Sequence, residues 1–169
     1  MTTSTGGTQA TGGASSAQDD AADREIVMTR TYDAPRALVY EVYTDPRHIG
    51  NWWGPRGFTT TTSEMDVRPG GMWRFVMHGP DGKDWGNRVV YRELVKPERI
   101  VWDHGSDVDD DPNGFHTTIT FTEEEDGRTT VTQRMRFATA EQREEKVRFG
   151  AVPLGQQTLD RLGEYLAGL

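Results

Sequence analysis

Apolar and polar residues alternate along much of the chain between Arg24 and Phe137, as they do in strands that bury one face. At the start of this segment, the two faces of a predicted strand are formed by Ile26, Met28 and Tyr32 on one side, and by Thr29 and Thr31 on the other. The pattern predicts a half-buried first strand, which Val27 and Arg30 interrupt.

A helix is predicted directly after this strand. Asp33 or Ala34 can cap it, and Pro35 falls in its first turn. Its apolar face is formed by Leu38, Val39 and Val42. The helix should end at Asp45-Pro46, and a second short turn through residues 47–49 leads to Trp52-Trp53.

From Phe58 to Phe137 the pattern predicts about six strands in an antiparallel meander, because turn residues break it five times. The breaks lie at residues 69–71, 79–82, 96–98, 107–114 and 126–127. The side chains predicted to face inward are Trp73, Phe75, Met77, Ile100, Trp102, His104, Phe115, Thr117, Ile119, Phe121, Val131, Gln133, Met135 and Phe137. Their neighbours along the strands are largely threonine and arginine and should face water.

The chain should end in a broken helix. Thr139 and Gln142 have capping-box spacing, and a strongly charged helix follows as far as Phe149. Gly150 and Pro153 should interrupt it before it resumes over 154–166, where Leu159, Leu162 and Leu166 form an apolar stripe. One long helix packed on a curved sheet buries both apolar surfaces, so the predicted fold class is α+β.

The chain has 169 residues, which predicts one folded domain over residues 24–169. Residues 1–23 contain little that is apolar and are predicted to form a disordered tail. The formal charge of −8 argues against a nucleic-acid partner, because phosphate binding needs clustered Lys and Arg. The absence of cysteine excludes disulfides and thiol catalysis. With no apolar run long enough to span a membrane, we expect a soluble, cytoplasmic protein.

Five sequence blocks occur in a characteristic order: Trp52-Trp53-Gly54-Pro55, residues 65–71 (MDVRPGG), Gly79-Pro80-Asp81-Gly82, residues 96–100 (KPERI) and Leu159-Asp160-Arg161-Leu162. In these blocks the chain resembles the activator of Hsp90 ATPase homologue-like family. That family belongs to the START and Bet v 1-like superfamily, also called SRPBCC. The resemblance implies a helix-grip fold, in which a curved antiparallel sheet wraps around a long carboxy-terminal helix and two short helices follow the first strand.

The resemblance also implies a ligand cavity between sheet and helix. The residues expected to line it are Trp52, Trp53, Trp73, Phe75, Met77, Tyr91, Trp102, Phe115, Met135 and Phe149. The alternative is that these side chains simply fill a core, as aromatic and methionine stripes usually do. Relatives often carry Gly-Trp where this chain has Gly155-Gln156, so Gln156 is a candidate to hydrogen-bond a carbonyl or hydroxyl of a ligand.

His104 is the principal titratable candidate, because alternation points it inward and an imidazole can transfer protons near neutral pH. Tyr91 and Gln133 are its candidate partners as acid, base or oxyanion-binding group. The alternative is a hydrogen-bonded core histidine. His48 lies close to the Trp52-Trp53 segment. Two positions remain for its side chain: the mouth of the cavity or the protein surface.

No pair of histidines has metal-ligand spacing, and no glycine-rich phosphate loop or serine nucleophile motif is present, so neither a catalytic metal nor a cofactor is expected. Three functions remain. The first is binding of a hydrophobic or amphipathic small molecule: a lipid, polyketide or aromatic metabolite. The second is a cofactor-free cyclase or dehydratase. The third, ranked last, is a co-chaperone. As for oligomeric state, exposed edge strands are compatible with a homodimer.

Overall fold

The computed structural model describes residues 22–169, so the predicted tail lies outside the described residues except for its last two. The elements are β1 (Glu25–Tyr32), α2 (Arg36–Thr44), α3 (Pro46–Ile49), β2 (Thr59–Met65), β3 (Met72–His78), β4 (Asp84–Val95), β5 (Arg99–Ser106), β6 (Phe115–Glu123), β7 (Thr129–Arg136), α4 (Ala140–Arg148) and α5 (Ala151–Ala167). None of the helices in this part of the chain combines the length and apolar character that crossing a bilayer requires.

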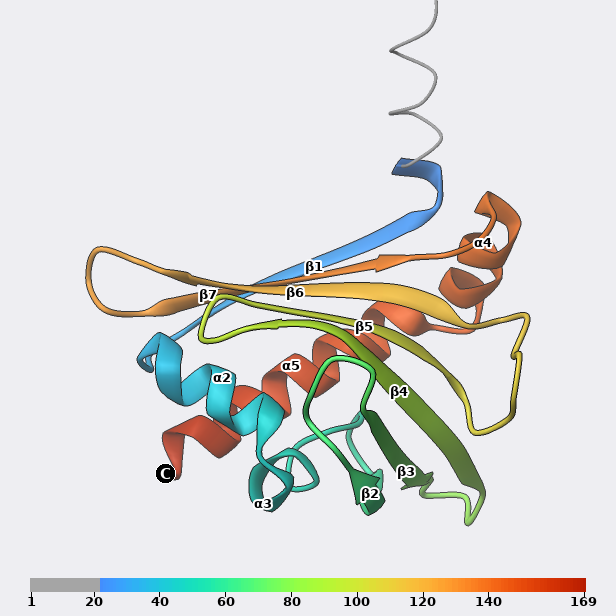
Figure 1. Cartoon of the computed structure of the whole chain (residues 1–169), viewed down its shortest axis with the longest axis horizontal. Coiled ribbons are helices and arrows are strands. Elements are labelled where there is room, and N and C mark those ends of the chain that lie inside the picture. The colour runs from blue at the N-terminus through green and yellow to red at the C-terminus, as the bar shows by residue number, and fades with distance from the viewer. Residues whose placement is uncertain (1–21) are drawn as a thin grey trace, which may run out of the picture.

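All seven strands form one antiparallel sheet in the order β1-β7-β6-β5-β4-β3-β2. The six strands of the predicted meander are confirmed, and β1 joins the sheet at β7. The sheet curves over α5, with α2 and α3 near the carboxy-terminal end of that helix and α4 at its other end (Figure 1). This is the helix-grip arrangement expected from the sequence.

The first helix begins later than predicted. Its amino-terminal cap is Pro35, which makes no side-chain capping bond, so the expected cap at Asp33 or Ala34 is wrong. Proline is tolerated there because the first N–H groups of a helix have no intrahelical partner. Its carboxy-terminal end at Asp45-Pro46 is confirmed, and the Asp45 side chain caps α3 by accepting from the Arg47 amide.

The break between the two last helices lies at one residue. Gly150 adopts a φ of 87°, a left-handed conformation that favours glycine, and α5 starts at the next residue. Pro153 therefore lies in the first turn of α5, where its missing N–H costs no intrahelical bond, and the predicted restart at Leu154 is three residues late. Thr139 caps α4 as expected, accepting from the Gln142 amide at 3.1 Å.

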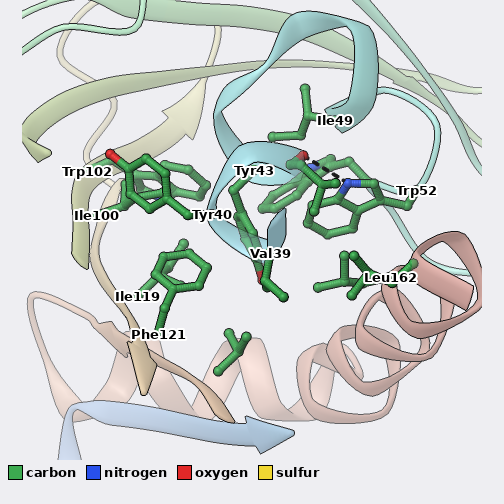
Figure 2. Packing of buried hydrophobic residues seen from close by; sticks show 14 of the residues in the cluster. Val39, Tyr40, Tyr43, Ile49, Trp52, Ile100, Trp102, Ile119, Phe121 and Leu162 are labelled. Atoms are coloured by element: carbon green, nitrogen blue, oxygen red, sulfur yellow. Dashed lines mark hydrogen bonds between the residues drawn. The ribbon is translucent and has the colours of Figure 1, made fainter. Parts of the chain in front are cut away.

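Most of the core is one cluster between the sheet and the helices. In Figure 2 the α2 residues Val39, Tyr40 and Tyr43 lie among Trp52, strand residues such as Trp102 and Phe121, and Leu162 of α5. The predicted inward stripe of α5 is confirmed, since Leu159, Leu162 and Leu166 are buried. Four of the five tryptophans are buried in this cluster, whereas Trp85 is 55% exposed.

α5 lies very close to β1 at Gly155. A Cβ added there would lie 2.5 Å from Cε of Met28, so a larger residue would push the two elements apart or displace the Met28 side chain. Beside this contact, Arg30 of β1 ion-pairs with Asp160 and donates to Oε1 of Gln156 at 2.7 Å. Arg30 thus faces the helix, on the same side of β1 as Ile26, Met28 and Tyr32, which explains why a charged residue interrupts the expected apolar face.

All four residues of the Leu159-Asp160-Arg161-Leu162 block make structural contacts. While Leu159 and Leu162 are buried and Asp160 pairs with Arg30, Arg161 extends its guanidinium to the loop that follows Trp53. Its Nη1 donates to the carbonyl oxygens of Gly54 at 2.8 Å and of Pro55 and Phe58 at 3.2 Å. The block therefore links the long helix to the Trp-Trp-Gly-Pro loop.

Candidate functional site

The predicted wall aromatics lie largely against one another. Trp73 stacks on Phe75 with ring centroids 3.9 Å apart, and Trp53 meets Trp73 and Trp102 edge to face at 5.2 and 5.7 Å. Such geometries are those of aromatic rings packed in protein interiors. Trp52 and Tyr91 belong to the same cluster, and Met77 packs against it. In the described structure these side chains therefore fill the space beneath the middle of the sheet.

The remaining predicted wall residues lie elsewhere. Met135 belongs to a second, smaller cluster with Ile26, Met28, Phe137 and Leu159, against which Phe115 packs. Phe149, at the α4–α5 junction, is 76% exposed. Gln156 is bonded to Arg30 through its carbonyl oxygen, so it anchors α5 to the sheet.

A hollow of about 290 Å³ lies between the ends of β4, β5 and β6 and the helix α4. We call it the α4 pocket. Its principal side chains are Asn87, His104, Phe115, Gln142, Lys146 and Phe149. Three of these, His104, Phe115 and Phe149, were predicted from the sequence as site residues, and the other three were not.

The hydrogen bonds of His104 define its tautomer. Asn87 donates its Nδ2 to the carbonyl oxygen of Trp85 at 2.9 Å, which orients its Oδ1 toward the histidine. His104 Nε2 lies 3.0 Å from that oxygen and must therefore carry the proton and donate. Nδ1 of His104 is then an unprotonated acceptor.

The imidazole is neutral at pH 7. Burial among aromatic rings, together with the nearby Lys146, lowers the pKa of His104 to about 4, against an opposing contribution from Asp111. The nearest ring is that of Phe115, with centroids 4.9 Å apart. His104 is therefore a neutral hydrogen-bond acceptor beside an aromatic ring rather than a charged group.

Gln142 and Lys146 of α4 add to a polar lining that also includes Asp111, Asn113 and Glu145. Gln142 donates its Nε2 to the carbonyl oxygen of Pro112 at 3.2 Å, and its buried Oε1 has no hydrogen-bond partner among residues 22–169. The Lys146 ammonium lies 5.9 Å from the centroid of the Phe115 ring. Such a pocket can hold a molecule with an apolar ring and a hydroxyl or carbonyl group.

The three candidate catalytic residues do not converge. His104 lies on β5 and Gln133 on β7, two strands away. The β7 residue level with His104 across the sheet is Phe137, and Gln133 is four residues from it along the strand. At about 4.8 Å per strand and 3.3 Å per residue, this separates His104 and Gln133 by about 16 Å. Tyr91 is fully buried beside Trp102, and burial raises the pKa of its hydroxyl.

Three buried polar groups form a row across the inner face of the sheet. Tyr91 pairs with Trp102, which pairs with Thr117. The Tyr91 hydroxyl, the Trp102 Nε1 and the Thr117 Oγ1 have no hydrogen-bond partner within the described part of the chain. A buried group without a partner costs on the order of 1–3 kcal/mol, so this row is costly to the fold.

A larger hollow, of about 810 Å³, lies mainly over the outer face of the sheet beside residues 107–111. Its cations are paired: Arg92 and His116 with Asp103, Arg88 with Asp107 and Asp109, and Arg136 with Glu25. These cations are thus already paired within the protein. The α4 pocket, which holds an unpaired acceptor beside the rings of Phe115 and Phe149, is the stronger candidate site.

Comparisons with known proteins agree with this fold. The family model described as activator of Hsp90 ATPase homolog 1-like protein matches residues 33–167. A search of the curated proteins found no match.

Three solved structures illustrate the similarity. A Mycobacterium smegmatis protein is 25% identical with a TM-score of 0.76, over 87% of this chain and 93% of that one. An Arthrobacter aurescens protein is 21% identical with a TM-score of 0.80, over 88% of each chain. A Nitrosomonas europaea protein is 23% identical with a TM-score of 0.78, over 87% of this chain and 96% of that one. These similarities support the fold.

Proposed function

The chain belongs to the activator of Hsp90 ATPase homolog 1-like family, and from this premise we propose that it binds a small amphipathic molecule in the α4 pocket. The observation that carries the proposal is the composition of that pocket. Apolar rings line it beside two hydrogen-bond acceptors that the described protein leaves open, Nδ1 of His104 and Oε1 of Gln142. The other lining side chains, among them Asp111, Asn113 and Glu145, are largely polar, so the two rings and the open acceptors together would orient a small ligand with both an apolar and a polar side.

The size of the pocket favours a compact ligand. A volume of about 290 Å³ is near the lower end of ligand sites, which extend from roughly 300 to 1,000 Å³. Of the ligand classes considered, an aromatic metabolite with a hydroxyl group fits this volume better than a lipid does. The hydroxyl would donate to His104 or Gln142 while the ring contacts Phe115 and Phe149.

A cyclase or dehydratase activity has less support. A general base works best when its pKa lies near the operating pH, whereas that of His104 lies at about 4. Its candidate partners Tyr91 and Gln133 do not line the α4 pocket. Binding, which requires only the open acceptors and the two aromatic rings, is therefore the function that we favour.

The proposal is tested by displacement of a fluorescent probe. The protein is titrated with 8-anilinonaphthalene-1-sulfonate, and small hydroxylated aromatic compounds are screened for saturable displacement. Replacing Phe149 by Ala should weaken binding of the probe about tenfold, because a large apolar contact is lost. Phe149 is 76% exposed, so this change should leave the fold intact.

Val108→Ala is the matched control, because Val108 is also an exposed apolar residue but lines the outer hollow. We expect it to bind the probe as the wild type does. Equal loss in both variants, or no saturable binding to the wild type, would contradict the proposal. Native mass spectrometry of gently purified protein would identify a co-purified ligand directly.

A further inference from the structure

Three side chains with metal-ligating atoms meet where α2 passes into α3. They are Glu41, Asp45 and His48, and their ligand atoms all lie within 4.8 Å of one another. The separation of His48 Nε2 from Glu41 Oε1 is 3.9 Å. Glu41 lies in the last turn of α2, Asp45 at the junction and His48 in α3, so the change of direction at Asp45 brings the three side chains together. The group contains a single histidine, so the absence of histidine pairs in the sequence does not reveal it.

The orientation of His48 suits a metal ligand. Its Nδ1 lies 2.6 Å from the hydroxyl of Tyr165 on α5, and the two rings meet edge to face. Metal-ligating histidines almost always use the second ring nitrogen for a hydrogen bond, which fixes the tautomer. When Nδ1 donates to Tyr165, Nε2 presents its lone pair on the side of Glu41.

A hollow borders the same two carboxylates. Its volume is about 430 Å³, and Glu41 and Asp45 line it together with Thr44, Pro46 and Lys96. An ion held by three protein ligands keeps a coordination position for water or a small anion. The hollow beside Glu41 and Asp45 provides room for that further ligand.

We propose that Glu41, Asp45 and His48 bind a divalent transition-metal ion such as Zn²⁺. One imidazole and two carboxylates are ligands that zinc accepts. Because the three atoms are at most 4.8 Å apart, an ion central to them would lie no more than about 2.8 Å from each, and movements of up to about 0.7 Å bring them to zinc–ligand distances of about 2.1 Å. Glu41 is exposed and can make this movement.

Arg47 competes for the site. Its Nη2 donates to Asp45 Oδ2 at 2.7 Å and its Nε to Oδ1 at 3.1 Å, so the ion must displace the guanidinium from that carboxylate. The Arg47 side chain is 80% exposed and can move into solvent. Because this pair must break, removal of Arg47 should strengthen metal binding.

Isothermal titration calorimetry with Zn²⁺ at pH 7.5, on the full chain without a histidine tag, tests the proposal. We expect one ion per chain. Each of the variants His48→Gln and Glu41→Gln should bind at least about tenfold more weakly, and Tyr165→Phe should also bind more weakly through loss of the hydrogen bond to His48. Arg47→Ala should bind more tightly than the wild type.

His78→Gln is the control, because His78 also lies beside a carboxylate, Asp84 at 2.7 Å, but belongs to no group of three ligands. It should bind Zn²⁺ as the wild type does. Circular dichroism without metal verifies that each variant is folded, and the exposed Glu41 remains informative if His48→Gln is not. The proposal is overturned if the wild type binds no stoichiometric zinc, or if both ligand variants bind it as tightly as the wild type does.

Discussion

His104 and Asn87 form a pair in which each fixes the other's chemistry. The Asn87 amide bonds to the backbone of Trp85, so its oxygen accepts from Nε2 of His104. Burial and Lys146 keep the ring neutral. The histidine that the sequence marks as a candidate proton carrier is therefore suited to accept a hydrogen bond from a ligand.

The low pKa of His104 makes stability depend on pH. Because the folded-state pKa of about 4 lies below the unfolded value of about 6.5, the unfolded chain takes up a proton first as the pH falls. Between pH 7.5 and 5, this should lower the free energy of unfolding by up to about 2 kcal/mol. The full stability is present above pH 6.5 and is lost toward pH 4.

Urea denaturation of the wild type and of His104→Gln, measured at pH 7.5 and at pH 5, tests this linkage. The variant should lack most of the decrease, since glutamine does not titrate. An unchanged pH dependence in His104→Gln would show that other groups cause it. The carboxyl groups whose pKa is lowered in the fold, such as Asp103 and Asp111, contribute mainly below this range.

Alternation along β5 predicts that His104 faces inward, and this is confirmed by its contacts with Phe75 and Phe115. Its partner Asn87 was not identified as a site residue, although it alternates with Val89 and Tyr91 on the inner face. Gln142 and Lys146 were missed because they lie on a helix whose sequence indicates only a charged surface. Which helix face meets the sheet depends on the angle at Gly150, which a local pattern does not contain.

At the scale of elements, the contact of Arg161 with the Trp53–Phe58 loop connects α5 to the segment that precedes β2. Its Nη1 is within hydrogen-bond distance of several backbone carbonyls, and burial lowers the pKa of the guanidinium. Carbonyl groups arranged around one cation lose their common donor if the cation is removed.

Replacing Arg161 by Ala should therefore lower the free energy of unfolding by about 1.5–3 kcal/mol, the range for hydrogen bonds to charged groups. Arg161→Lys should recover part of this loss, because one ammonium can still donate to some of the carbonyls. Thermal and urea denaturation measure both. If the alanine variant is as stable as the wild type, the loop is held by other contacts.

α4 is the helix with the weakest attachment. It has no buried residue, whereas α5 buries three leucines. Hydrogen bonds from Gln142 to Pro112 and from Arg143 to the carbonyl of Glu25 attach it to the rest of the protein.

Amide hydrogens of α4 should consequently exchange with solvent through a local opening, at a lower free energy than those of α5. Hydrogen–deuterium exchange followed by mass spectrometry compares peptides from residues 140–148 and 157–167. Equal protection of the two helices would contradict this expectation. A ligand that binds the α4 pocket should slow exchange in the first peptide.

The helix caps illustrate where prediction at this scale fails. Pro35 is expected in the first turn of α2 but is its amino-terminal cap. Pro153 is expected to interrupt the last helix but lies in the first turn of α5. The sequence places proline near a helix end, but the exact first residue depends on backbone angles that packing decides.

At the scale of the whole molecule, the fold was predictable because alternation, turns and five ordered motifs agree with each other. The location of the hollow was not predictable from the sequence. Periodicity gives the direction of a side chain but not the volume beyond it, so Trp73 and Phe75 could equally line a cavity or touch. Here they stack on each other, and the free space lies at the end of the sheet next to α4.

The unequal burial of the five tryptophans gives the protein an internal optical reporter. Emission from the exposed Trp85 should be quenched by acrylamide, and Trp85→Phe would leave only the shielded indoles. Among these, Trp53 has its ring 6.4 Å from that of His104. Occupancy of the neighbouring pocket could then be followed by the intrinsic fluorescence of the protein, without an attached dye.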